Sequence, residues 1–196
     1  MGSIVSLKNN KEYLWRGDET FWGGQAPILF PFVGRLKDDI FIANGKEYSQ
    51  KQHGFFRKSN EVKLIAKTET KLTYSIKHSE STLKVYPYEF EFRTSYELIE
   101  NTIVIHHYVE NLGNDIMYFS IGEHPAFNCS LKDLNLNYEQ SSLLFERSET
   151  EATWNLNKDG LFDNTTSEVL KNTNEIHLNA NSFDNDALVF KNLKSN

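Results

Sequence analysis

The feature that most constrains the fold of this chain is a long stretch in which apolar and polar residues alternate. Residues 88–98 read YEFEFRTSYEL. One set of alternate positions is aromatic or apolar apart from Thr94, and the other set is charged apart from Ser95. Because successive side chains of a β-strand point to opposite faces, the pattern predicts a long strand with one buried and one wet face. Such strands are typical of antiparallel sheets.

Shorter alternating runs surround this strand. IVIHHYVE (103–110) and IMYFSIG (116–122) follow it after short turns, and the three runs together predict an antiparallel meander. Upstream, Asn44-Gly45 lies between two alternating arms within residues 38–50 and predicts a hairpin. We expect further short strands at residues 61–67, 71–77, 81–86, 175–179 and 187–192.

Little of the sequence indicates helix. Residues 142–152 predict one or two helical turns, and the polar, Asn-rich residues 153–175 predict a long loop. Aromatic residues make up 13% of the chain, which favours strands because such side chains suit a half-buried pleated surface. We therefore expect an all-β fold, a large antiparallel β-sandwich, formed as a single domain by residues 1–196.

The net charge of the chain and the length of its apolar runs limit the cellular compartment and the classes of partner that we expect. The net charge is -6, from 21 basic and 27 acidic residues, and no basic cluster indicates nucleic-acid binding. No apolar run approaches the roughly 18 residues that cross a bilayer, and the start has no secretory signal pattern. Cys129 is the single cysteine, so no intramolecular disulfide can form. We expect a soluble, cytoplasmic protein with no membrane or nucleic-acid partner, and the sequence leaves its oligomeric state open.

The six histidines do not form a metal-binding pattern. His106 and His107 are adjacent on a predicted strand, so they point to opposite faces. The sequence contains neither the HExxH nor the CxxC motif of zinc sites. It also lacks the G-x-S-x-G motif of hydrolases and the glycine patterns of nucleotide sites. We expect no metal and no cofactor.

Two histidines and one arginine lie where glycine or proline constrains the backbone. His124 lies between Gly122 and Pro125 in SIGEHPAFNC, His53 precedes a glycine, and Arg35 follows one. A rigidly held imidazole suits a general acid, because proton transfer requires hydrogen-bond reach. Imidazoles, a bidentate guanidinium and aromatic rings suit a neutral polyhydroxylated ligand such as a sugar. The structural alternative is that these histidines end strands and that the glycines and prolines shape loops.

Four blocks at these positions resemble the aldose 1-epimerases, or galactose mutarotases, and in particular their LacX-like branch. The blocks are PFVGRLKDD (31–39), HGFFR (53–57), GEHPAFN (122–128) and FDNDALVF (183–190). Their order and spacing match, and the resemblance extends from Tyr13 to about Lys191. It implies the supersandwich fold of the mutarotases and the cofactor-independent interconversion of the α and β anomers of a free hexose.

The resemblance also implies roles for individual residues. His124 matches the general acid that protonates the ring oxygen of the sugar, and His53 matches the histidine that binds near that oxygen. Arg35 matches the arginine that holds sugar hydroxyls. Asp186 matches an aspartate that accepts hydrogen bonds from hydroxyls, with Asp184 as a competitor for this role.

The family's general base is a glutamate in a region beyond Asn196, so we expect the sequence to be incomplete at the C-terminus and shortened at the N-terminus. Two alternative functions remain open at this stage. The first is a hexose 6-phosphate epimerase, for which Arg57 and Arg93 are conceivable phosphate ligands. The second is a non-catalytic sugar-binding protein that lacks the base. A purely structural role for the sandwich is a third possibility.

Overall fold

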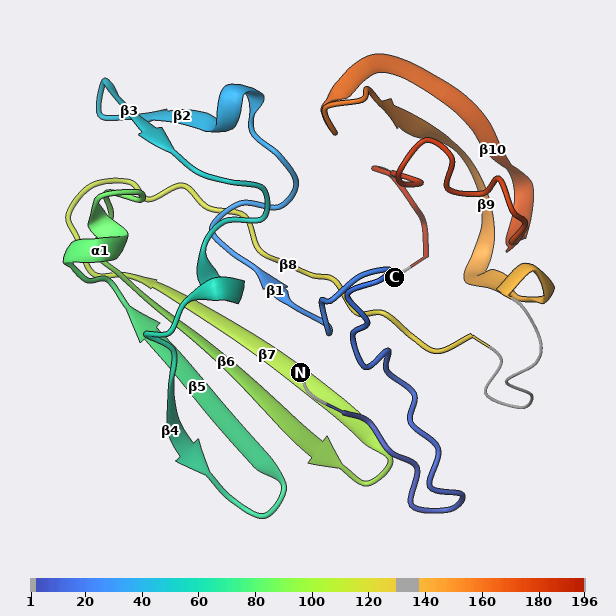
Figure 1. The fold of residues 1–196 in the computed structure, drawn as a ribbon, viewed down its shortest axis with the longest axis horizontal. Helices are drawn as coiled ribbons and strands as arrows, with labels where there is room; N and C mark the ends of the chain where they lie inside the picture. Colours follow the sequence, from blue (N-terminus) through green and yellow to red (C-terminus); the bar gives the residue numbers. More distant parts are fainter. Residues whose placement is uncertain (1–2, 130–137, 196) are drawn as a thin grey trace. The chain divides into compact units, whose positions relative to one another are not determined.

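The computed structural model describes residues 3–129 and 138–195 (Figure 1). The chain divides into two compact units. Residues 28–123 form one unit, here called the central unit, and residues 1–27 with residues 124–196 form the other, the flanking unit. Each unit is described by itself, and the expected single domain over residues 1–196 stays a prediction.

The central unit contains a four-stranded antiparallel sheet, whose strands lie side by side in Figure 1. In sheet order the strands are β4 (Lys63–Lys67), β5 (Lys71–Lys77), β6 (Phe90–Ile99) and β7 (Thr102–Asn111). The predicted strands at 61–67, 71–77, 88–98 and 103–110 are thus confirmed as one meander. Short turns join β4 to β5 and β6 to β7, whereas residues 78–89, which include a short helix, join β5 to β6.

One face of β6 is buried as the alternation predicts, but the opposite face is not uniformly wet. Phe90, Phe92 and Thr94 are buried, and so is Glu91 on the other face. The Glu91 carboxylate accepts hydrogen bonds from Arg93 and from Ser75 Oγ. Long side chains with paired charges therefore cover a position that the pattern assigns to solvent.

Two shorter strand pairs complete the central unit. The predicted hairpin is confirmed: β2 (Ile40–Ala43) pairs with β3 (Lys46–Ser49). Asn44 (φ 50°) and Gly45 (φ 72°) form its turn in the left-handed backbone region. A second pair joins β1 (Ile28–Leu29) to β8 (Gly122–Glu123), with Ile28 opposite Glu123.

The expected third strand of the meander at 116–122 is wrong, because only the last of these residues enters a strand, β8. Residues before β8 instead run beside a segment that contains Pro31. Ser120 N donates to Pro31 O at 2.8 Å, and Val33 N donates to Ser120 Oγ at 3.0 Å. Proline has no N–H, so this segment cannot form a continuous ladder.

The expected strand at 81–86 is also wrong, since a short helix, α1 (Glu80–Leu83), occupies its first half. Ser79 caps this helix through a reciprocal pair of hydrogen bonds with Thr82. Such a capping box satisfies two helix-start N–H groups and overrides the weak alternation. The 3-10 turns η1 (Lys37–Asp39), η2 (Phe56–Lys58) and η3 (Tyr138–Gln140) are the other helical segments described.

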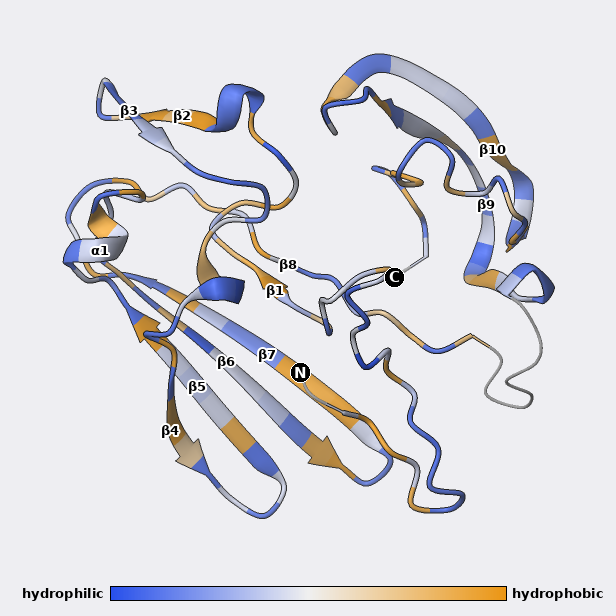
Figure 2. Ribbon diagram, in the orientation of Figure 1, coloured by the Kyte–Doolittle hydropathy of each residue, from blue (hydrophilic) through white to orange (hydrophobic). Residues whose placement is uncertain are grey.

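The flanking unit contains a long antiparallel pair, β9 (Ser142–Leu156) and β10 (Phe162–His177), curved in Figure 1. The helical turns expected at 142–152 and the loop expected at 153–175 are therefore wrong. Figure 2 shows why: β10 is largely hydrophilic, so neither face carries the apolar alternation of a half-buried strand. The expected strand at 175–179 is confirmed only as the end of β10.

The expected strand at 187–192 is wrong, although this segment does contact β9. Trp154 N donates to Val189 O at 2.9 Å. Val189 N returns its hydrogen bond to the side chain of Thr153, at 2.8 Å, and not to a backbone carbonyl. A ladder requires backbone groups on both sides, so the pairing ends there.

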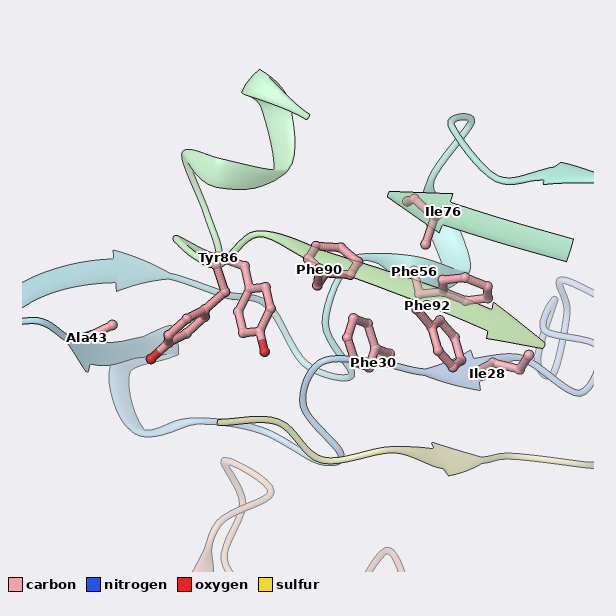
Figure 3. Close-up of a cluster of buried hydrophobic side chains, with 9 residues drawn as sticks. Ile28, Phe30, Ala43, Phe56, Ile76, Tyr86, Phe90 and Phe92 are labelled. Atoms are coloured by element: carbon pink, nitrogen blue, oxygen red, sulfur yellow. The ribbon is translucent and has the colours of Figure 1, made fainter. Parts of the chain in front are cut away.

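The hydrophobic core of the central unit is mainly aromatic (Figure 3). Phe30 is fully buried, and its ring stacks on Phe92 with centroids 4.7 Å apart. Ring pairs of this kind contribute about 0.5–1.5 kcal/mol beyond their buried area. The buried members of the cluster are Ile28, Phe30, Ala43, Phe56, Ile76, Tyr86, Tyr88, Phe90 and Phe92.

The predominance of strands confirms the all-β fold class. Within the described ranges, no helix is long and apolar enough to cross a membrane.

Candidate functional site

Arg35 and His53, 18 residues apart in sequence, are linked through Gly34 in the central unit. His53 N donates to Gly34 O at 2.9 Å, and Gly34 N donates to His53 Nδ1 at 3.1 Å. Because Arg35 directly follows Gly34, this reciprocal pair of hydrogen bonds holds the backbone of the predicted sugar-binding arginine beside the predicted binding histidine.

Gly54 explains why the histidine can occupy this position. A Cβ atom on Gly54 would lie 2.2 Å from the carbonyl oxygen of Phe30, so only glycine allows this approach. The same oxygen accepts hydrogen bonds from Phe55 N and Phe56 N, at 3.1 and 3.2 Å. His53 itself has a φ of 68°, which a non-glycine residue adopts only when its surroundings impose it. The His-Gly pair therefore connects the site to the aromatic core.

Arg35 is held from its C-terminal side by a carboxylate that sequence analysis did not single out. Arg35 Nε lies 3.5 Å from Asp39 Oδ1, and both side chains remain more than a third exposed. Asp38 and Asp39 have φ values of 58° and 55°, so the turn after Arg35 adopts the left-handed region at two successive residues. Left-handed aspartates are uncommon, and such strain is found preferentially at functional sites.

His124 begins the second segment of the flanking unit and is exposed. Its backbone N donates to Pro27 O at 3.0 Å. Its ring lies 4.9 Å from the ring of Trp22, centroid to centroid. Pro125 restricts the backbone of His124, as the sequence predicts. Trp22 is a neighbour that sequence analysis missed, because no local pattern relates positions 22 and 124.

Asp186 also lies in the flanking unit, in an exposed turn. Its φ is 73°, and its N–H donates to Phe183 O at 3.0 Å. Its competitor Asp184 accepts a hydrogen bond from Asn181 Nδ2 at 2.7 Å, so that carboxylate is used within the turn.

His107 has a partner that the sequence did not indicate. Its Nε2 lies 3.2 Å from Glu123 Oε1, across 16 residues of sequence. The ring of His107 also lies against Phe92 of the core, with centroids 5.7 Å apart. The pair connects β7 to β8, and so supports the strand that leads directly into His124.

The structure thus brings two of the four predicted site residues, Arg35 and His53, together within the central unit. His124 and Asp186 belong to the flanking unit. The assignment of all four to one site stays a prediction. Within residues 3–129 and 138–195, no group of three or more His, Cys, Asp or Glu side chains could hold a metal ion.

Comparisons with known proteins agree on one group of relatives. Residues 2–193 match the sequence profile of the family described as aldose 1-epimerase. The plasmid and chromosomal LacX proteins of Lactococcus lactis subsp. lactis are each 36% identical over a 204-residue alignment. That alignment covers 99% of this chain and 68% of each LacX protein.

Solved structures show the same relationship. A galactose mutarotase related enzyme from Lactobacillus acidophilus has a TM-score of 0.90 and 36% identity. A galactose mutarotase-like protein from Lactobacillus casei has a TM-score of 0.80 and 29% identity. The matches cover 98% and 90% of this chain, but the chain spans only 63% and 60% of those proteins.

Proposed function

Because this chain belongs to the aldose 1-epimerase family, we propose that it interconverts the α and β anomers of a free hexose without a cofactor. In the reaction a base removes the proton from O1, and an acid protonates the ring oxygen as the bond between C1 and that oxygen breaks. The open aldehyde rotates about the C1–C2 bond, and the ring closes on the other face. When the ring closes, the sugar regains the proton on O1 and the bond between C1 and the ring oxygen, so the reaction consumes no co-reactant.

His124 is the proposed acid of this reaction. An imidazole ordinarily titrates near pH 6.5, so this residue type can both hold and release a proton near neutrality. The backbone bond to Pro27 and the ring of Trp22 restrict its position. His53, Arg35 and Asp186 are the proposed ligands of the sugar's ring oxygen and hydroxyls. The base that accepts the O1 proton is not assigned to a residue of this chain.

The observation that carries the proposal is the reciprocal hydrogen bonding between Gly34 and His53. It holds the backbone next to Arg35 beside His53, and a guanidinium and an imidazole both suit hydroxyl and ether oxygens. The core carbonyl of Phe30 leaves no room for a Cβ at Gly54 and so fixes the backbone after His53. A backbone held in this way supports specific binding of a neutral ligand, because less ordering is required on binding.

The test is the mutarotation of freshly dissolved α-glucose and α-galactose, followed by polarimetry. We expect His124→Asn to lower kcat by at least about 100-fold, since a positioned acid contributes about 10²–10⁴ in rate. His177→Asn is a matched control, because His177 is an exposed histidine of the same unit that contacts Ser142 Oγ. Near-normal turnover by His124→Asn would reject His124 as the acid.

Two alternative functions remain to be separated from this one: epimerisation of a hexose 6-phosphate, and sugar binding without catalysis. A phosphorylated substrate requires free cationic groups for its dianion. Arg93, one of the two arginines considered for that role, is already paired with Glu91 at 2.6 Å, and Arg57 donates to Gln52 O. We therefore propose a free hexose over hexose 6-phosphate. Saturable hexose binding by calorimetry without acceleration of mutarotation would indicate a binding protein instead.

A further inference from the structure

The indole of Trp22 lies against the imidazole of His124, and both residues belong to the flanking unit. The two ring centroids are 4.9 Å apart, and the ring planes meet at 41°. Aromatic rings at this separation attract each other, and an indole ring also attracts a cation such as a protonated imidazole. Unlike a carboxylate, an indole accepts no proton. Trp22 can therefore orient the imidazole without competing for the proton that an acid must give up.

A tight turn holds the backbone of Trp22. Trp22 N donates to Asp18 O at 2.7 Å, and Asp18 N returns a hydrogen bond to Trp22 O at 3.2 Å. The indole nitrogen of Trp15 also donates to Trp22 O, at 2.8 Å. Inside the turn, Thr20 N donates to Asp18 Oδ1 at 2.9 Å. These hydrogen bonds fix the point of the backbone from which the indole projects.

Gly24 determines where the indole can lie. A Cβ atom on Gly24 would lie 2.4 Å from Cζ2 and 2.5 Å from Cε2 of Trp22. The indole therefore rests directly on the backbone of Gly24, where any side chain would displace it. Three residues later, Pro27 O accepts the hydrogen bond from His124 N at 3.0 Å. One short segment thus contacts the indole and holds the backbone of the histidine.

The segments that carry the two rings are also joined to each other. Trp15 N donates to Ala126 O at 2.9 Å. Leu14 pairs with Phe127 in an antiparallel bridge. The contact between the indole and the imidazole therefore rests on paired backbone as well as on the side chains themselves.

From this geometry we propose that Trp22 is a positioning residue for His124, and that its indole holds the imidazole in one rotamer before the sugar binds. His124 is exposed, and exposed side chains ordinarily exchange between rotamers. An acid that has to find its orientation in each turnover loses rate, because a displacement of about 1 Å can cost about 100-fold. The role of His124 as acid comes from the proposed function, on which this inference rests.

The orientation of the imidazole can be measured without any sugar. Coupling constants across the Cα–Cβ bond of His124, measured by NMR, should show one rotamer in the wild type. Trp22→Leu keeps an apolar side chain but removes the aromatic ring, so we expect averaged couplings in this variant. The ring current of the indole should also separate the His124 ring-proton shifts of the two proteins. Averaged couplings in the wild type, or identical ring-proton shifts, would overturn the proposal.

Mutarotation kinetics test whether this orientation serves the reaction. We expect Trp22→Leu to lower kcat by about 10–100-fold and to leave KM within about twofold, because the aim of the acid changes and the sugar ligands do not. Trp22→Phe keeps an aromatic ring and should retain kcat within about fivefold of the wild type. Phe21→Leu is the matched control, since Phe21 is 80% exposed beside Trp22 and should change neither constant. Normal kcat in a folded Trp22→Leu variant, checked by circular dichroism, would overturn the proposal.

Gly24→Ala tests the same role while the indole is kept. The backbone of Gly24 lies outside the left-handed region, so the added Cβ acts mainly on the indole that it would meet. We expect this substitution to lower kcat by about tenfold in the wild-type background but by less than about twofold in the Trp22→Leu background. Equal losses in both backgrounds would mean that Gly24 acts independently of the indole, which would contradict the proposal.

Failure of the proposed function would give a different pattern. If the wild type does not accelerate mutarotation, or if His124→Asn keeps full turnover, the role of His124 as acid fails. The NMR couplings then still decide whether Trp22 fixes the imidazole. If the wild type is active and His124→Asn is not, unchanged kcat in Trp22→Leu rejects Trp22 alone.

Discussion

The central unit buries a continuous aromatic cluster, whereas the buried side chains described in the flanking unit are few and include Glu149 and Thr153, whose oxygens accept backbone hydrogen bonds. In the central unit, Phe30 contacts five other aromatic rings. In the flanking unit, Glu149 is 1% exposed, and its carboxylate accepts hydrogen bonds from the backbone N–H groups of Lys194 and Ser195. The buried apolar side chains described there are Leu14, Ala26, Leu170 and Leu178.

The difference suggests how each set of predicted site residues is held. His53 precedes Gly54, which packs on the carbonyl oxygen of Phe30 in the core, and hydrogen bonds between His53 and Gly34 hold the residue before Arg35. The backbone of His124 is held through its bond to Pro27, and that of Asp186 through its bond to Phe183. Hydrogen bonds at exposed positions open more readily than packed cores do. We therefore expect the central unit to be the more rigid of the two.

The largest effect is expected from removing the centre of the aromatic cluster. Phe30→Ala should lower the free energy of unfolding by about 3–5 kcal/mol, because it deletes a fully buried ring and leaves a cavity. Urea denaturation followed by circular dichroism measures this loss. Phe21→Ala, at a side chain that is 80% exposed in the flanking unit, should change stability by about 0.5 kcal/mol or less. Equal losses of stability in the two variants would contradict the proposed difference between the two units.

The next effect tests the one carboxylate buried in the central sheet. Hydrogen bonds from Arg93 lower the pKa of Glu91 from 4.5 to about 2, with Ser75 contributing in the same direction. The unfolded chain therefore binds more protons between these values, so stability should fall as the pH decreases from about 4.5 towards 2. Glu91→Gln should lose about 1–3 kcal/mol at neutral pH.

The acid dependence provides the control for Glu91. Denaturation at several pH values should show a shallower acid decline in Glu91→Gln than in the wild type, because the variant has no proton to bind at this position. An unchanged slope would mean that the cluster around Glu91 does not set the acid stability of the central unit.

A smaller, local effect is expected in the flanking unit. Glu149→Gln should weaken the bonds to Lys194 and Ser195, and hydrogen bonds from the same groups lower the pKa of this carboxyl. We expect amide exchange at those two residues to quicken by about tenfold or more. Exchange at Phe92 should not change. Glu146→Gln is the matched control, because Glu146 is exposed on the same strand.

The smallest effect is expected from alanine substitutions at one turn glycine in each unit, which compare the two units directly. Gly45 (φ 72°) and Gly160 (φ 71°) both lie in turns, one in each unit, with no atom within 4 Å of an added Cβ. Alanine at either should therefore cost about 1 kcal/mol through backbone strain alone. We expect hydrogen exchange to quicken only in the unit that carries the substitution. If both variants quicken exchange in both units, the units unfold together.

The sequence predicted the parts of the fold that local chemistry determines. Alternation located β6 and β7, and Asn44-Gly45 located the hairpin, because strand period and turn conformation depend on neighbouring residues. It failed for β9, whose first part predicted helical turns, and for β10, whose polar residues on both faces resemble a loop. It also failed at α1, where the hydroxyl of Ser79 outweighs the alternation.

For the candidate site, too, the sequence predicted the features that depend on neighbouring residues and missed those that depend on tertiary contacts. Glycine and proline next to Arg35, His53 and His124 marked these residues as constrained, and these signals can be read locally. The bond between Gly34 and His53 and the contact of His124 with Trp22 depend on the folded backbone. Residues far apart in sequence meet only through tertiary structure, so no window of sequence predicts such pairs.

The chain enters and leaves the central unit through paired backbone. Ile28 lies opposite Glu123 in the β1–β8 ladder, and His124 N is bound to Pro27 O just outside it. Antiparallel partners are only about 4.5–5.5 Å apart between Cα atoms, so residues 28–123 have the geometry of an exchangeable cassette whose two ends meet. Homologous segments grafted at this junction would therefore join the flanking residues through the same paired backbone.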